Sequence, residues 1–232
     1  MITLFSILLL GFFLGMRHAT DADHVVAVTS IVSQQRSIRA AAGTGIFWGI
    51  GHSLTLLFVG GTIIAFGLVV SRKLGLSFEL SVAVTLIILG LLNLNAAFGW
   101  FGNREAMGKR HEEENARLDR WLARFRSGSV LQPLVIGLVH GLAGSASVAL
   151  LVLPLIHGTS EAIAYLLVFG LGTIAGMMLI TAAIALPFRY AAESSAGWHR
   201  MLGGLAGATS FGFGTFLVYQ IGFVEKLFLA GS

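Results

Sequence analysis

A run of five ionisable residues inside an apolar segment constrains this chain more than any other feature. The run, from Arg17 to His24 (RHATDADH), lies between the apolar stretches 2–16 and 25–32. Charged side chains in hydrocarbon are costly, so they face a bundle interior or a cavity and commonly mark a transport or binding path. Two imidazoles and two carboxylates also suit a divalent transition metal. The run therefore favours a membrane site for such an ion.

The composition supports a membrane setting. The chain has 232 residues, of which 56% are hydrophobic and 11% are charged, whereas a soluble domain of this size needs a more charged surface. The net charge of +4 does not indicate a nucleic-acid-binding protein, because the basic residues lie in short loops between apolar runs. The chain has no cysteine, which excludes thiolate metal ligands and disulfides.

Six apolar runs are long enough to span a bilayer, which takes about 20 residues of helix. They are residues 2–32, 40–70, 80–101, 130–156, 162–188 and 201–223. The first would be about 50 Å long as one straight helix, so we expect a break or a tilt. The prediction is an all-α integral membrane protein with six transmembrane segments and a first helix interrupted at the charged run.

Basic residues in the loops predict the orientation of the chain. Most follow the first, third and fifth runs: Arg36, Arg39, Arg104, Lys109, Arg110, Arg117, Arg120, Arg124, Arg126, Arg189 and Arg200. The positive-inside rule places these loops in the cytoplasm and both termini outside. The long loop 103–128 is predicted to be an amphipathic cytoplasmic linker lying on the inner membrane surface.

The two halves of the chain resemble each other over short stretches. Residues 14–19 (LGMRHA) match 136–141 (IGLVHG) at an offset of 122, and 48–51 (WGIG) match 169–172 (FGLG) at an offset of 121. Three segments per half would make the halves an inverted repeat, an architecture that places a transporter's binding site at the repeat interface. The predicted units are 1–102, the linker 103–128, and 129–232. Chance similarity between glycine-rich membrane helices is the alternative.

A regular helix cannot bring all the donors of the charged run to one ion. His18 and Asp21 are neighbours at 100° per residue, but Asp23 points away from them. The backbone must unwind here, which is tolerated at membrane depth only where protein or water satisfies the freed groups. His18, Asp23 and His24 are then the leading candidate ligands. The alternative is a helix end at the membrane interface, where charges cost little.

Arg17 and Asp21 are predicted to support the site. Arginine stays protonated and has no lone pair to offer a metal. We expect Arg17 to pair with Asp21 or with another carboxylate, which would keep that acid ionised in a low-dielectric site.

Other polar residues inside the apolar runs are further candidates. His52, between small and hydroxyl residues, is predicted to lie beside the metal path, and His140 is given the same interpretation because it repeats His18. Ser145 lies in the small-residue stretch after His140 and is a supporting candidate, as is Asn93. A buried histidine or asparagine can instead simply bond between helices, and the small residues can be a packing seam.

The string RHATDADH, with its H-x4-D-H core, resembles the signature of the nickel/cobalt transporter family of secondary metal permeases. Gly51-His52-Ser53 resembles that family's next motif. The resemblance implies that His18, Asp23, His24 and His52 select Ni²⁺ or Co²⁺. The chain lacks the extra N-terminal helix and the second-half acidic motif of typical members, and so looks more like the shorter branch associated with urease accessory membrane proteins and nickel-permease-like proteins.

These observations predict a secondary transporter of Ni²⁺ or Co²⁺ in the cell membrane, working as an importer. The metal is cargo, no prosthetic group is expected, and there is no phosphate-binding loop for ATP hydrolysis. Two alternatives are an exporter and a non-transporting accessory that delivers metal to urease or hydrogenase maturation partners. A membrane metalloenzyme is disfavoured because no separate nucleophile is evident. The oligomeric state is left open.

Overall fold

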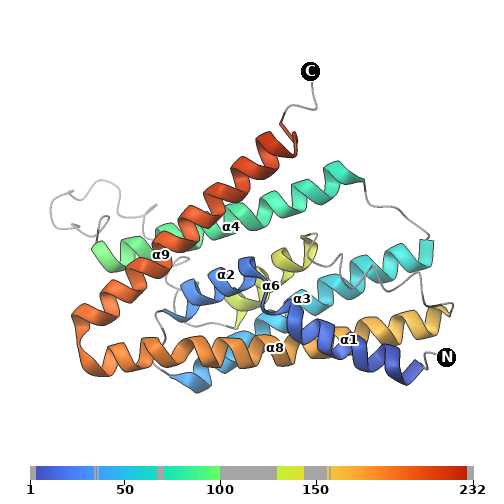
Figure 1. Cartoon of the computed structure of the whole chain (residues 1–232), viewed down its shortest axis with the longest axis horizontal. Helices are drawn as coiled ribbons and strands as arrows, with labels where there is room; N and C mark the ends of the chain where they lie inside the picture. The colour runs from blue at the N-terminus through green and yellow to red at the C-terminus, as the bar shows by residue number, and fades with distance from the viewer. Residues whose placement is uncertain are drawn as a thin grey trace, which may run out of the picture.

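The computed structural model describes residues 4–33, 35, 37–66, 71–99, 130–143, 156 and 158–228. Within these ranges the chain is all-helical, as predicted, with seven α-helices, a terminal π-helical turn and no strand (Figure 1). The helices are α1 (Leu4–His18), α2 (Ala22–Val32), α3 (Ile38–Phe66), α4 (Arg72–Phe98), α6 (Leu131–Leu142), α8 (Thr159–Ser194) and α9 (Ala196–Tyr219), and the π-helical turn is η3 (Gln220–Val224).

Four helices in the described part of the chain are long and apolar enough to cross a membrane. These are α3, α4, α8 and α9 with its π-helical extension, and the bent pair α1 and α2 makes a fifth span if it is counted as one. Helix α6, with 12 residues, is too short to cross by itself. The structure therefore supports four or five of the six predicted spans. Most of 144–157 and the whole predicted linker 103–128 lie outside the described residues.

The predicted interruption of the first helix is present at the charged run. Helix α1 ends at His18 and α2 begins at Ala22, and the two helices are bent by 55° relative to each other. The amides of Thr20 and Asp21 bond the carbonyls of Arg17 and His18 at 2.8 and 3.0 Å, which tightens the last turn. Asp21 then adopts extended backbone angles (φ −61°, ψ 146°) and caps α2. The side chain of Asp21 makes no capping hydrogen bond to the first turn of α2, and its carboxylate contacts His18.

Small residues let the helices pack closely around this break. Helix α3 packs along α8 and α6, α1 packs along α8, and α4 pairs with α9. A Cβ atom added to Gly141 of α6 would lie 2.7 Å from the carbonyl oxygen of His52 in α3. Such close backbone approach is the usual function of small residues between membrane helices.

The two short helices α2 and α6 lie between the longer ones. Figure 1 shows α4 and α9 crossing as one pair, α1, α3 and α8 forming a second group, and α2 and α6 lying between them. The amide nitrogen of Asn93 in α4 donates to the carbonyl of Ser30 in α2 at 2.6 Å, and Ser53 of α3 donates to the carbonyl of Gly170 in α8 at 3.1 Å. These bonds fix α2 and α3 in place beside the bend.

Candidate metal centre

Three histidines from three helices meet at the bend. His18 ends α1, His24 lies in the first turn of α2, and His52 lies in the middle of α3. Their exposed fractions are 3%, 0% and 0%. One ring nitrogen from each lies within 4.8 Å of the other two, and the Nε2 atoms of His18 and His52 are 3.1 Å apart. Two nitrogens bound to one ion at about 2.0–2.1 Å lie about 3 Å apart, so this spacing fits a shared metal.

Each of two carboxylates contacts one of these rings. Oδ1 of Asp23 accepts a hydrogen bond from Nδ1 of His24 at 3.1 Å. Oδ2 of Asp21 lies 2.8 Å from Nδ1 of His18, an ion-pair distance without hydrogen-bond geometry. A carboxylate on one ring nitrogen orients an imidazole and leaves the other nitrogen for a metal. Asp21, Asp23 and His24 also form a group close enough to hold an ion themselves.

A fourth histidine comes from the other half of the chain. His140, near the end of α6, is fully buried, and its ring centre lies 5.6 Å from that of His24. Its Nδ1 lies 2.9 Å from the carbonyl oxygen of Ile136. The ring of Trp48 in α3 packs against this group, with its centre 5.0 Å from that of His140 and 6.2 Å from that of His24. Trp48 thus forms an apolar wall against two of the imidazoles.

Several ring nitrogens in this group have no hydrogen-bond partner among the described residues. They include Nε2 of His24, Nδ1 of His52 and Nε2 of His140, all on fully buried side chains. A buried polar atom without a partner costs about 1–3 kcal/mol. Several such atoms on neighbouring buried imidazoles are therefore typical of a site that gains a cation.

Two other predicted site residues, Arg17 and Asn93, are not among the converging donors. The side chain of Arg17 is exposed and makes no ion pair in the described part of the chain, while Asp21 contacts His18 instead. The reason is the break, because Asp21 no longer lies one helical turn beyond Arg17. Asn93 holds α4 against α2 and is not one of the converging donors. Ser145 lies outside the described residues.

The chain matches the family model described as NicO, high-affinity nickel-transport protein, over residues 4–196. This match covers all four clustered histidines and most of the chain. The protein belongs to the NicO family. The family resemblance predicted from the RHATDADH motif is thereby confirmed, and the apolar helices together with the family establish a multi-pass membrane protein.

Relatives of this NicO protein carry transport and accessory names. It is 35% identical to the urease accessory protein UreH of Bacillus sp. (strain TB-90), over 98% of this chain and 96% of that protein. It is 32% identical to the hydrogenase nickel incorporation protein HupN of Bradyrhizobium diazoefficiens, over 37% of this chain and 24% of that protein. It is 43% identical to the nickel transporter NixA of Staphylococcus aureus, over 22% and 15% of the two chains. No solved structure matches the chain.

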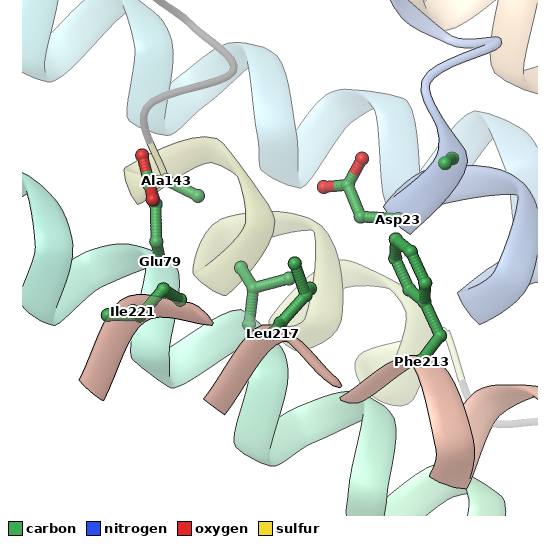
Figure 2. Close-up of a pocket in the computed structure, with 8 residues that line it drawn as sticks. Asp23, Glu79, Ala143, Phe213, Leu217 and Ile221 are labelled. Carbon is green, nitrogen blue, oxygen red and sulfur yellow. The ribbon is translucent and has the colours of Figure 1, made fainter. Parts of the chain in front are cut away.

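Sequence reasoning missed Glu79, which lines a pocket beside the centre. The pocket, of about 210 Å³, is bordered by Asp23 of α2, Glu79 of α4, the end of α6 and apolar side chains of α9 (Figure 2). Glu79 is the one acidic residue within α4. The predicted third segment began at residue 80 and so left Glu79 in a loop, whereas α4 begins at Arg72. An acid inside a membrane helix was the signal that could have identified it.

Proposed function

We propose that this NicO-family protein is a secondary transporter that moves Ni²⁺, with Co²⁺ as a second substrate, into the cell. The observation that carries the proposal is the convergence of buried imidazoles from His18, His24 and His52 at the broken first helix. Imidazole suits late first-row divalent ions, and a site within the bilayer beside an interrupted helix is the pattern of secondary transporters. We propose no catalytic reaction for this site.

The donor set supports a site that releases its ion. Neutral imidazoles leave the charge of a divalent cation largely uncompensated, so they hold it less firmly than a cage of carboxylates would. In this proposal Asp23 orients His24 and supplies one negative charge nearby. Direct coordination by the second oxygen of Asp23 stays a prediction.

The predicted six-span inverted repeat is also part of the proposal, and reciprocal helix contacts support it. A Cβ atom on Gly15 would clash with the carbonyl of Phe169, and one on Gly137 would clash with the carbonyl of Trp48. Gly15 and Gly137 are 122 residues apart, and Trp48 and Phe169 are 121 apart, the same offsets as in the sequence repeat. Each half therefore presses its first helix onto the second helix of the other half in the same way.

Further close contacts are reciprocal in the same way. Gly51 approaches the carbonyl of Leu134, and Gly172 approaches the carbonyl of Phe12 in the matching position. Between the third helices, Gly90 of α4 meets Phe211. The matching Gly214 of α9 meets Ile87. Two-fold pseudosymmetry of this kind is what an inverted repeat predicts.

The route to the centre and the orientation are proposed from the pocket and the loop charges. The pocket lies between α4, α9, the start of α2 and the end of α6, and the side chains of Asp23 and Glu79 both line it. Paired acids in a low-dielectric cleft raise the local concentration of a cation. We propose that this is the outer approach, with both termini outside and the basic loops, including 103–128, in the cytoplasm.

The second candidate function is a membrane accessory that binds nickel and delivers it to urease or hydrogenase maturation proteins without transporting it. The observation that favours it is the full-length similarity to a protein named as a urease accessory protein. The two candidates differ in one measurable property, which is whether nickel crosses the membrane.

Accumulation of radioactive nickel in proteoliposomes tests the proposal. The protein should fill the lumen with ⁶³Ni²⁺ in a saturable way, with ⁵⁷Co²⁺ measured in parallel. Reversing the imposed membrane potential distinguishes import from export. His18→Ala and Asp23→Asn should abolish or slow uptake. His199→Ala, which changes a histidine far along the chain in α9, is the matched control and should leave uptake unchanged. Vesicles that bind nickel without gaining lumenal metal would exclude transport and leave the accessory function.

A further inference from the structure

The side chain of His140 has the features of a metal ligand. A carbonyl oxygen can only accept a hydrogen bond, so the 2.9 Å contact with Ile136 requires the ring proton to be on Nδ1 of His140. The lone pair of the neutral ring is then on Nε2. That atom is buried and has no partner among the described residues. Its ring is therefore oriented and deprotonated at the atom that binds metals.

His24 presents the same arrangement from the other half of the chain. Its Nδ1 is bonded to Asp23, and its Nε2 is buried without a described partner. Two neighbouring imidazoles that each direct their proton to an acceptor both keep a lone pair, and they cannot satisfy each other. A cation satisfies both at once.

The ring spacings of His18, His24 and His52 are those of imidazoles that share one ion, and His140 lies next to them. With metal–nitrogen bonds of about 2.0–2.1 Å, the centres of two imidazoles on the same ion lie about 4.5–5.5 Å apart at ligand angles of 90–120°. The distance is 4.9 Å for His18–His24, 4.9 Å for His18–His52 and 5.1 Å for His24–His52. For His24–His140 it is 5.6 Å, just beyond this range, and His140 is not one of the donors that lie within 4.8 Å of one another. A small shift of its ring or of α6 toward His24 is therefore part of binding the same ion. His140 thus adjoins the three clustered histidines through His24.

We propose that Nε2 of His140 is a direct ligand of the transported cation, which is then held by four imidazoles, three from the first half of the chain and one from the second. The inference rests on the proposed function. It also goes further, because a ligand from each half couples the bound ion to the relative position of the halves. The ion then senses any movement of α6 against α2 and α3.

Nickel binding to the purified protein in detergent tests this ligand separately from transport. His140→Gln keeps an amide donor for the Ile136 carbonyl but removes the imidazole, and His199→Gln is the matched control. We expect nickel affinity, measured by equilibrium dialysis with ⁶³Ni²⁺, to fall about 10- to 100-fold or more in His140→Gln, since losing even a partner of a ligand costs that much. His199→Gln should bind like the parent.

Thermal unfolding separates a ligand from a purely structural residue. A ligand variant should keep the melting temperature of the metal-free protein and lose most of the increase that nickel produces. A structural role would lower the metal-free melting temperature and leave the nickel-induced increase intact, which would overturn the proposal. If no variant at residue 140 folds, X-ray absorption at the nickel edge of the parent protein decides. Scattering from four imidazoles supports His140, whereas scattering from three excludes it, whether or not the protein transports nickel.

Discussion

In the proposed inverted repeat, the break between α1 and α2 and the end of α6 occupy matching places, but they carry different chemistry. The first holds His18, Asp21, Asp23 and His24, whereas among the described residues the second holds one ionisable side chain, His140. The close glycine contacts on either side correspond pair by pair. In the proposed repeat, the helix packing is thus duplicated while the candidate metal donors are not. We propose that helix packing defines where the site lies and that a single helix break supplies most of its ligands.

The largest expected effect is a loss of nickel affinity when a histidine at the break between α1 and α2, or the adjoining His52, is replaced. Replacing His52 or His24 with alanine removes an imidazole from the centre of the group. We expect nickel affinity to fall by more than about 100-fold, beyond the range for losing a residue that only hydrogen-bonds a metal ligand. Equilibrium dialysis with ⁶³Ni²⁺ measures the change. Affinity within a factor of about two of the parent would show that the ion binds elsewhere.

The two carboxylates of the first break should differ in importance. Asp23 bonds His24 and its side chain is 18% exposed, while the side chain of Asp21 is 42% exposed and contacts His18 without hydrogen-bond geometry. Asp23→Asn should lower nickel affinity about 10- to 100-fold, as for other partners of metal-binding histidines. Asp21→Asn serves as the matched comparison and should have a smaller effect because solvent screens its charge. Equal effects would mean that exposure does not separate the two roles.

The duplicated packing predicts paired losses of stability. An alanine at Gly15 or at Gly137 would push its Cβ into the backbone of the opposing helix, so each change should cost about 1–3 kcal/mol. Gly43 of α3 has no atom within 4 Å of an added Cβ, and Gly43→Ala should be neutral or stabilising by up to about 1 kcal/mol. Thermal unfolding in detergent measures all three. A large loss of stability at one of the two paired glycines with none at the other would contradict the proposed symmetry of the helix packing.

The smallest expected effect concerns Glu79. Its side chain lines the pocket together with that of Asp23 but is not one of the clustered metal donors. Glu79→Gln should raise the nickel concentration for half-maximal uptake about two- to fivefold and leave the maximal rate unchanged, because it removes only local attraction of the cation. The effect should shrink as salt rises. A loss of maximal rate would instead place Glu79 in the translocation step.

The sequence predicted the parts of the site that depend on local chemistry. The apolar runs and the ionisable residues between them predicted an all-helical membrane protein, a broken first helix and the close approach of His18, His24 and His52, all of which the structure shows. The sequence placed Asp21 beside both Arg17 and His18 and could not predict that Asp21 contacts His18 while the side chain of Arg17 is exposed, because this depends on the direction in which the chain leaves α1. It also could not show how close His140 comes to His24, because that distance depends on how α6 packs on α3.

Anomalous X-ray scattering from a nickel-loaded crystal tests the central claim most directly. The account predicts one strong nickel peak inside the bundle, about 2 Å from ring nitrogens of His18, His24 and His52. A nickel peak at the membrane surface, or at Asp21 and Asp23 without the three imidazoles, in protein that still accumulates nickel would contradict it.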